Sequence, residues 1–247
     1  MACIHFIGGE KGGVGKSVTA RTLAQFHIDR EIPFQVFDSD GSHGAMLRFY
    51  GDFSEPLNID AFESADRIIE AAAESEVNVI VDLAAQTSRF LRIWFKQNDL
   101  PALAAELGLE LIYWHVMDDG HDSLALLDVL LDDYSDAVSY VLVRNHGRGR
   151  DFQAFDKSDA KARFDAIGAQ IVDLGGLHPP TMTKIDHFGS SFWAAVNHRN
   201  ADLGPALGIM ERQRVRVWLR NAYSEIEKLP CFAPGTHTPA NETDTQA

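Results

Sequence analysis

The sequence has few cysteines and lacks any long hydrophobic run. Its two cysteines, Cys3 and Cys231, match no spacing of metal-ligating cysteines in a chain of 247 residues, which excludes a cysteine zinc site and a disulfide framework. This usage is typical of a reducing compartment, so a cytoplasmic location is predicted. No stretch reaches the roughly 18 apolar residues of a membrane span. The chain opens on ACIHFIGG without a charged leader, so we expect a soluble protein that is not exported.

Basic side chains are also in the minority. The chain has 22 Lys and Arg against 36 Asp and Glu, a formal net charge of −14. An average field of this sign repels nucleic acid and acidic lipid, which excludes a protein whose whole surface binds either one. Any contact with DNA is therefore expected at a small basic face.

Short apolar runs alternate along the chain with longer amphipathic patterns. Runs such as IHFI and YVLV are continuously hydrophobic, which is typical of buried parallel strands. The alternation predicts one α/β domain over 1–232, with a doubly wound, mostly parallel β-sheet flanked by helices. Residues 233–247 lack large apolar side chains and are expected to form a disordered polar tail. We predict strands at 4–7, 34–37, 77–83, 109–116, 139–143 and 169–174, and helices near 18–30, 63–74, 87–106, 121–134, 158–167 and 210–228.

A glycine-rich loop stands between the first predicted strand and the first predicted helix. Its sequence is GGEKGGVGKS, residues 8–17. Glycines let consecutive backbone N–H groups converge on an anion, and the start of the following helix adds partial positive charge. Lys16 can reach the outer phosphates of a nucleotide, and the Ser17 hydroxyl can bind Mg²⁺. The general phosphate-loop pattern requires glycine where this chain has Glu10.

The segment KGGVGKS, residues 11–17, resembles the deviant Walker A loop of the ParA/MinD family of P-loop ATPases, in which a second lysine precedes the glycines. The motif is specific, and the resemblance covers residues 1–85 well and the remainder only as an alternation of strands and helices. It implies ATP and Mg²⁺ as cofactors and slow, partner-stimulated hydrolysis. It also implies that Lys11 reaches the nucleotide of a partner subunit, so that ATP holds a homodimer together. The residues that it places on the nucleotide are Gly12, Gly13, Val14, Gly15, Lys16 and Ser17.

Three carboxylates follow predicted strands: Asp38 and Asp40 in FQVFDSDG, and Asp82 in VNVIVDL. The first segment is similar to the family's D-x-D segment, whose second carboxylate positions the attacking water, and this gives that role to Asp40. We place Asp38 near the Mg²⁺. Asp82 looks like the Walker B aspartate, because a carboxylate buried at a strand end needs a cation or hydrogen-bond donors, and water-bridged Mg²⁺ supplies that partner. Relatives commonly have proline close to this aspartate, whereas this chain reads DLAAQ, so the loop geometry is expected to differ.

Two further strand ends carry polar residues. Asn145, in YVLVRNHG, falls where P-loop ATPases of this type often contact the adenine base. His115, Asp118 and His121 crowd the run HVMDDGHDS, whose spacing fits no common zinc site. We interpret this run as a turn in which Asp or His caps the next helix.

Arginines gather in two places. One is the loop RNHGRGR at 144–150, and the other is a stripe of Arg212, Arg216 and Arg220, spaced four residues apart on the last predicted helix. The resemblance makes the stripe a candidate for non-specific DNA binding, and a solvated helix face explains it equally well. MinD proteins end in a basic amphipathic helix that binds membrane. Because the tail of this chain is polar and not basic, we expect no membrane attachment by that route.

The leading hypothesis is a ParA/MinD-like ATPase that acts as an ATP-dependent dimerisation switch with a protein activator. Plasmid or chromosome partition, conjugative transfer and positioning of cellular machinery are the roles that the resemblance implies. An alternative on the same scaffold is an ATP-dependent ligase or synthetase, with His115, Asp118, His121 and residues 176–191 lining its substrate pocket. A third interpretation is a nucleotide-binding regulator with little turnover.

Overall fold

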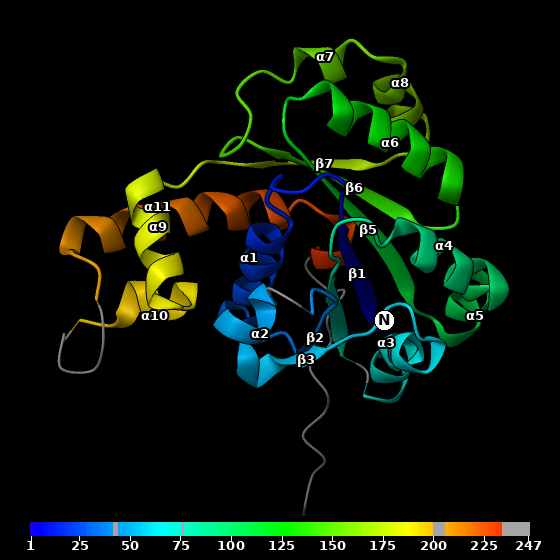
Figure 1. Ribbon diagram of the computed structural model, residues 1–247, viewed down its shortest axis with the longest axis horizontal. Helices are drawn as coiled ribbons and strands as arrows, with labels where there is room; N and C mark the ends of the chain where they lie inside the picture. The colour runs from blue at the N-terminus through cyan, green and yellow to red at the C-terminus, as the bar shows by residue number, and fades with distance from the viewer. Residues whose placement is uncertain (42–43, 76, 200–205, 234–247) are drawn as a thin grey trace, which may run out of the picture.

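The computed structural model describes residues 1–41, 44–75, 77–199 and 206–233, and it contains a seven-stranded sheet (Figure 1). All of the strand pairs are parallel, and the strand order is β3-β2-β4-β1-β5-β6-β7. The order reverses around β1, so the loop that follows β1 opens at the point where ligands bind in doubly wound sheets. The strands are β1 (Cys3–Gly8), β2 (Phe34–Asp38), β3 (Ser54–Pro56), β4 (Asn78–Asp82), β5 (Glu110–Met117), β6 (Ser139–Asn145) and β7 (Gln170–Leu174).

The hydrophobic runs account for the interior of the sheet. Every residue of β1 is buried, and the strand pairs with β4 on one side and β5 on the other. The six predicted strands are confirmed. The edge strand β3 was not predicted, because its three residues, SEP, are partly exposed and carry no apolar run that could signal a strand.

Helices cover both faces of the sheet, as the doubly wound prediction requires (Figure 1). One apolar cluster joins the sheet to α1 (Lys16–Asp29), α2 (Ala45–Phe49), α9 (Pro179–Phe188), α10 (Phe192–Asn197), α11 (Ile209–Ile226) and the short η3 (Pro230–Phe232). The other joins it to α3 (Phe62–Glu74), α4 (Ser88–Gln97), α5 (Leu100–Leu107), α6 (His121–Tyr134), α7 (Gln153–Asp156) and α8 (Asp159–Ala166). The turn η1 (Gly51–Phe53) precedes β3.

One predicted helix is wrong in its extent. The amphipathic pattern over 87–106 predicts a single helix, whereas the structure divides it into α4 and α5. Asp99 lies between them in the left-handed region with φ 45°, and Pro101 stands in the first turn of α5. A proline is tolerated at the start of a helix but removes an interior hydrogen bond, so the chain ends one helix and begins another here.

A lobe of α9, α10 and α11 extends beyond the sheet, at the left of Figure 1. Only its last helix was predicted, because α9 and α10 are short and lie in a segment rich in Pro, His and Ser. In the described part of the chain, no helix combines the length and the apolar character needed to cross a membrane. Apart from Ala233, the predicted disordered tail lies outside the described residues.

Candidate nucleotide-binding site

The glycine-rich loop leaves β1 and ends where α1 begins. Gly15 is the N-cap residue of α1. Among the described residues, no side chain caps this helix, and its first turn contains no acidic residue. The first N–H groups of a helix have no partner within the helix, and together with the helix dipole they attract an anion. The loop therefore ends in a set of donors suited to phosphate oxygens.

Two glycines give the loop its shape. Gly13 has φ 80° and faces open space, whereas Gly15 has φ 104° and a β-carbon there would lie 2.1 Å from Nδ2 of Asn145. Nδ2 of Asn145 donates to the Val14 carbonyl at 2.7 Å, and its Oδ1 accepts from the N–H of Gly147 at 3.0 Å. Asn145 thus braces the loop from the end of β6. Its contact with adenine stays a prediction.

Lys16 folds back over its own loop. Its Nζ donates to the carbonyl oxygens of Gly9 at 2.8 Å and Lys11 at 3.2 Å, and its side chain is almost fully buried. Burial lowers the pKa of this ammonium group. Neutral carbonyl oxygens are weaker partners for a cation than charged oxygens, so an incoming phosphate would compete well for Lys16.

Asp82, at the end of β4, lacks a partner for one of its carboxylate oxygens. The residue is 4% exposed, and its Oδ1 is buried with no hydrogen bond among the described residues. Burial and the neighbouring Asp38 charge raise its pKa to about 7, while a hydrogen bond from Ser17 works in the opposite direction. A buried carboxylate beside a serine hydroxyl fits an ion such as Mg²⁺, which prefers oxygen ligands and keeps several waters.

Asp38 has a different environment, although the strand register pairs it with Asp82. Its Oδ1 accepts from the N–H of Asp40 at 3.0 Å, and its Oδ2 accepts from the N–H of Met46 at 2.7 Å and Leu47 at 3.3 Å. Burial raises its pKa. Asp38 therefore lies near the predicted metal position, but its oxygens hold the turn and the start of α2 together.

Asp40 lies beyond the end of β2, close to the other charged groups of the site. Its negative charge is close enough to raise the pKa of both Lys16 and Asp82, although burial is the largest influence on each. The structure thus brings Asp40, Asp82 and Lys16 to the same end of the sheet, which is the arrangement that the sequence predicts. The role of Asp40 in positioning water stays a prediction.

Lys11 is held by an ion pair within the same chain. Its Nζ lies 2.8 Å from Oδ2 of Asp118, and the lysine side chain remains 30% exposed. The hydrogen bond that Lys11 donates to Asp118 raises the pKa of Lys11. Asp118 also accepts from the N–H of Gly120 at 3.0 Å and from the Ser123 hydroxyl at 2.6 Å, where α6 begins. The second lysine of the loop is thereby tied to the end of β5.

Residues 118–120 form the predicted turn between β5 and α6, but the predicted cap by Asp or His is wrong. Gly120 is the N-cap residue, without a side-chain cap, and Asp118 accepts from its N–H and from the Ser123 hydroxyl. His115 is buried, its Nε2 contacts the Ser123 carbonyl at 3.2 Å, and burial lowers its pKa to about 4. His121 lies on the surface at the first position of α6. Within the described ranges no three His, Cys, Asp or Glu side chains form a group that could hold a metal ion.

No protein-family model matches the chain. It is 25% identical over 241 residues to Protein TraL of Escherichia coli, an alignment that covers 92% of this chain and 98% of that protein. It is 25% identical over 173 residues to Protein MobD of Acidithiobacillus ferrooxidans, covering 68% and 75% of the two chains. Among solved structures it resembles the MinD cell division protein of Aquifex aeolicus, with a TM-score of 0.51, 14% identity and coverage of 89% and 97%. The MinC:MinD complex from the same organism gives a TM-score of 0.52, 13% identity and coverage of 91% and 96%. The fold is that of the MinD/ParA-type P-loop ATPases.

Within this MinD/ParA-type fold, the segment after β4 is held by two side chains, one from the P-loop and one from the segment after β2. Oε1 of Glu10 accepts from the N–H of Ser88, the first residue of α4, at 3.0 Å. The Ser39 hydroxyl donates to the Asp82 carbonyl at 3.1 Å and accepts from the N–H of Ala84 at 2.8 Å. Sequence reasoning missed both, and treated Glu10 only as a departure from the glycine pattern. An acidic residue inside a phosphate-binding loop was the available signal.

A small cavity of about 190 Å³ adjoins the P-loop at the carboxyl ends of β6 and β7. The indole Nε1 of Trp218 donates to the Gly175 carbonyl at 2.5 Å and so fixes one wall. Residues 176–191, which the ligase hypothesis assigns to a substrate pocket, contribute to this cavity. The position suits the base of a nucleotide whose phosphates lie on the P-loop of a MinD/ParA-type fold. The walls contributed by Val18, Gly175 and Trp218 were not predicted.

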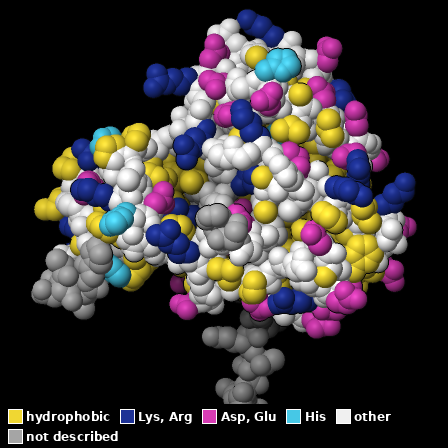
Figure 2. Space-filling model, in the orientation of Figure 1, with side chains coloured by type: hydrophobic (Ala, Val, Ile, Leu, Met, Phe, Trp, Pro, Cys, Tyr) yellow, Lys and Arg dark blue, Asp and Glu magenta, His cyan; other side chains and the backbone are white. Residues whose placement is uncertain are grey.

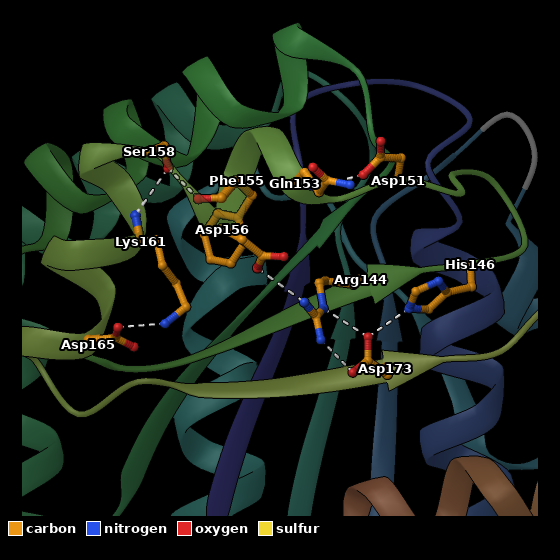
Figure 3. A network of polar contacts seen from close by, with 10 residues as sticks. All are labelled: Arg144, His146, Asp151, Gln153, Phe155, Asp156, Ser158, Lys161, Asp165 and Asp173. Atoms are coloured by element: carbon orange, nitrogen blue, oxygen red, sulfur yellow. Dashed lines mark hydrogen bonds and ion pairs between the residues drawn. The ribbon is translucent and has the colours of Figure 1, made fainter.

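The arginine cluster of the loop after β6 is partly neutralised (Figure 3). Arg144 donates through Nε and Nη2 to the two oxygens of Asp173 at 2.8 and 2.6 Å, and its Nη1 reaches Asp156 at 3.2 Å. His146 contacts the same Asp173 at 2.7 Å. Arg148 and Arg150 remain exposed. The cluster is therefore not one basic patch, because its first arginine joins β6, β7 and α7.

Proposed function

We propose that this protein is an ATP hydrolase of the MinD/ParA type that works as an ATP-dependent dimerisation switch. The observation that carries the proposal is the arrangement at the end of the sheet, where Lys16, Ser17 and the partly unpaired Asp82 lie beneath an anion-binding helix start. Lys11 stands at the outer side of the same loop.

Each residue of the site has a task in the proposed reaction. Lys16 exchanges its two carbonyl contacts for phosphate oxygens. Ser17 and Asp82 would hold the Mg²⁺, which would neutralise charge on the phosphates. Asp40 orients the attacking water, and the backbone N–H groups of 12–17 hold the phosphates in place. Hydrolysis in such a site depends on positioning and charge stabilisation, so no strong base is required.

The switch depends on Lys11. Its ion pair with Asp118 lies partly in solvent, and pairs of this kind contribute roughly 1 kcal/mol or less, so the lysine can leave at little cost. In the ATP-bound dimer Lys11 reaches the phosphates of the partner subunit. The pair with Asp118 then belongs to the monomer, and its exchange for a phosphate couples nucleotide binding to association.

The proposed biological role is in conjugative transfer. TraL and MobD are conjugation proteins, and both resemble this chain over most of its length. We further propose a cytoplasmic location and a protein activator. The likeness to the MinD of a MinC:MinD complex supports a protein partner of this kind.

The test combines nucleotide binding with measurement of molecular mass. The parent is expected to be a monomer with ADP and a dimer with ATP and Mg²⁺. Lys16→Ala should lose nucleotide binding, whereas Lys11→Ala should still bind ATP but fail to dimerise. Lys96→Ala, an exposed lysine of α4, is the control. Intact binding in Lys16→Ala, or unchanged dimerisation in Lys11→Ala, would refute the mechanism.

The ligase alternative is separated by what stimulates the reaction. Phosphate release that rises with a protein partner or DNA supports the switch, and release that requires a small carboxylic acid supports a ligase. The buried, neutral His115 bonded to the Ser123 carbonyl gives the ligase no support. A regulator with little turnover would show no difference in phosphate release between the parent and Asp40→Ala.

A further inference from the structure

A cleft of about 400 Å³ lies between α10, α11 and the end of α1, away from the P-loop. Trp193 of α10 stands at its wall with 51% of its surface exposed. Arg216 and Arg220, one helical turn apart on α11, line the same cleft. Figure 2 shows basic, histidine and hydrophobic side chains side by side on the lobe of α9, α10 and α11, while acidic side chains are more numerous on the opposite side of the molecule.

The two acidic residues of the cleft already have partners. Asp29 accepts from the Tyr223 hydroxyl at 2.7 Å and from Gln25 at 2.9 Å. Glu227 accepts from Arg30 at 2.6 Å. Asp29 keeps its negative charge because its donors are neutral, whereas Glu227 is paired with Arg30, so the three arginines and two carboxylates of the cleft leave an excess of one positive charge.

The two arginines themselves have few contacts. Arg216 makes one long hydrogen bond, 3.4 Å, to the Val196 carbonyl. Arg220 has no ion pair with any residue that the structure describes. Arg212 differs, because it donates to the Leu207 carbonyl at 2.6 Å and does not line the cleft. The predicted stripe of three arginines is thus reduced to a pair, with an exposed indole added.

We propose that this cleft binds single-stranded nucleic acid. Arg216 and Arg220 hold successive phosphates, and Trp193 stacks on an unpaired base. An exposed indole offers a π-face to a base, and a base offers its own face only when it is unstacked, as in a single strand. In a duplex the bases are stacked inside the helix, so only the arginines would contribute to the affinity for duplex nucleic acid. The net charge of −14 confines such binding to this small face.

The cleft is joined to the candidate nucleotide site by direct contacts. The N–H of Trp193 donates at 2.8 Å to Oε1 of Gln25, a residue of α1, the helix that starts at the P-loop. Phe192 stacks edge-on against Trp218 with ring centroids 5.0 Å apart, and Trp218 bonds the wall of the small cavity beside the P-loop. Occupation of the cleft can therefore influence α1. The binding itself does not depend on the proposed ATPase activity.

The test is fluorescence anisotropy of a labelled 20-nucleotide oligothymidine with the full chain, without nucleotide and at low salt. We expect Trp193→Ala and the double variant Arg216→Gln with Arg220→Gln each to bind about tenfold more weakly. Trp193→Phe should retain most of the affinity. Arg214→Gln, an exposed arginine of the same helix outside the cleft, is the matched control and should bind like the parent.

Four results would overturn the proposal. They are absence of binding by the parent, equal weakening by Arg214→Gln, equal affinity for a duplex of the same length, and displacement by polyglutamate as effective as by unlabelled oligothymidine. The last result would identify an acidic peptide as the occupant. Thermal melting of each variant separates lost binding from lost folding. Lys16→Ala should still bind the oligonucleotide, so failure of the ATPase proposal and failure of this one are distinguishable.

Discussion

Two aspartates of parallel strands, Asp82 of β4 and Asp173 of β7, have opposite surroundings. Asp82 is buried, one of its oxygens has no hydrogen-bond partner among the described residues, and burial raises its pKa to about 7. Asp173 is 39% exposed and accepts from Arg144 and His146, and these hydrogen bonds lower its pKa although its partial burial acts in the opposite direction. A carboxylate that the protein has satisfied maintains structure, whereas a buried one left partly unsatisfied marks a place for a cation. The predictions below test this contrast.

The largest expected effect is on hydrolysis. Asp82→Asn keeps the size of the side chain but removes the charge that would hold Mg²⁺ through water. We expect phosphate release in the presence of ATP and Mg²⁺ to fall by about 10–100-fold. Asp173→Asn should leave it within about twofold, because Asp173 belongs to the Arg144 network and not to the site. Equal losses in the two variants would contradict the assignment of Asp82.

The next effect is on the free energy of unfolding without ligand, where we expect a substitution at the site to stabilise the protein. The pKa of Asp82 is higher in the folded chain than the ordinary 3.8, so its contribution to stability is full below that value and is lost as pH rises through about 7. Asp82→Asn removes the free-energy cost of burying an ionised carboxylate at high pH. We expect the variant to exceed the parent at pH 8 by on the order of 2 kcal/mol in free energy of unfolding, with the difference shrinking toward pH 4.

Urea unfolding at a series of pH values, without Mg²⁺ or nucleotide, measures this difference. Adding Mg²⁺ and ATP should reverse the order of the two proteins at pH 8, because the parent gains more binding energy from the metal than a variant without the Asp82 charge. A variant that is less stable than the parent at pH 8 without ligand would show that Asp82 is already satisfied by the fold.

The central part of this arrangement could be predicted from the sequence. Continuous apolar runs predicted six of seven strands, because buried parallel strands have no polar face to obscure the pattern. Lys16 and Ser17 follow from a local motif, and Asp82 follows from a carboxylate at the end of an apolar run. Information of this kind is contained in short segments, so one chain is enough to read it.

The rest depends on contacts between distant segments. Lys11 and Asp118 are 107 positions apart, and Trp193 lines one cleft with Arg216 and Arg220 only because α10 packs beside α11. No pattern in the sequence indicates that these residues lie close together. Asp38 illustrates a second limit. The hydrogen bonds that it accepts from backbone N–H groups depend on the conformation of the following loop and not on residue type.

The smallest expected effect is a loss of stability in Asp173→Asn, the other carboxylate of the comparison. Its pKa lies below the ordinary 3.8, so its contribution to stability is present above that value and is lost as pH falls through the lowered pKa. Solvent reaches this carboxylate and screens the pair with Arg144, so Asp173→Asn should lower the free energy of unfolding at pH 7 by only about 1 kcal/mol. The difference between the two proteins should shrink toward pH 3, as it does toward pH 4 for Asp82→Asn, but its sign at pH 7 is opposite, because here the variant is the less stable protein. Urea unfolding at pH 7 and pH 3 measures this, and Asp136→Asn is the control because Asp136 is exposed and has no ion pair with a described residue. If the free energy of unfolding of Asp173→Asn instead rose above that of the parent between pH 3 and pH 7, Asp173 would resemble Asp82. The distinction between a satisfied and an unsatisfied carboxylate would then fail.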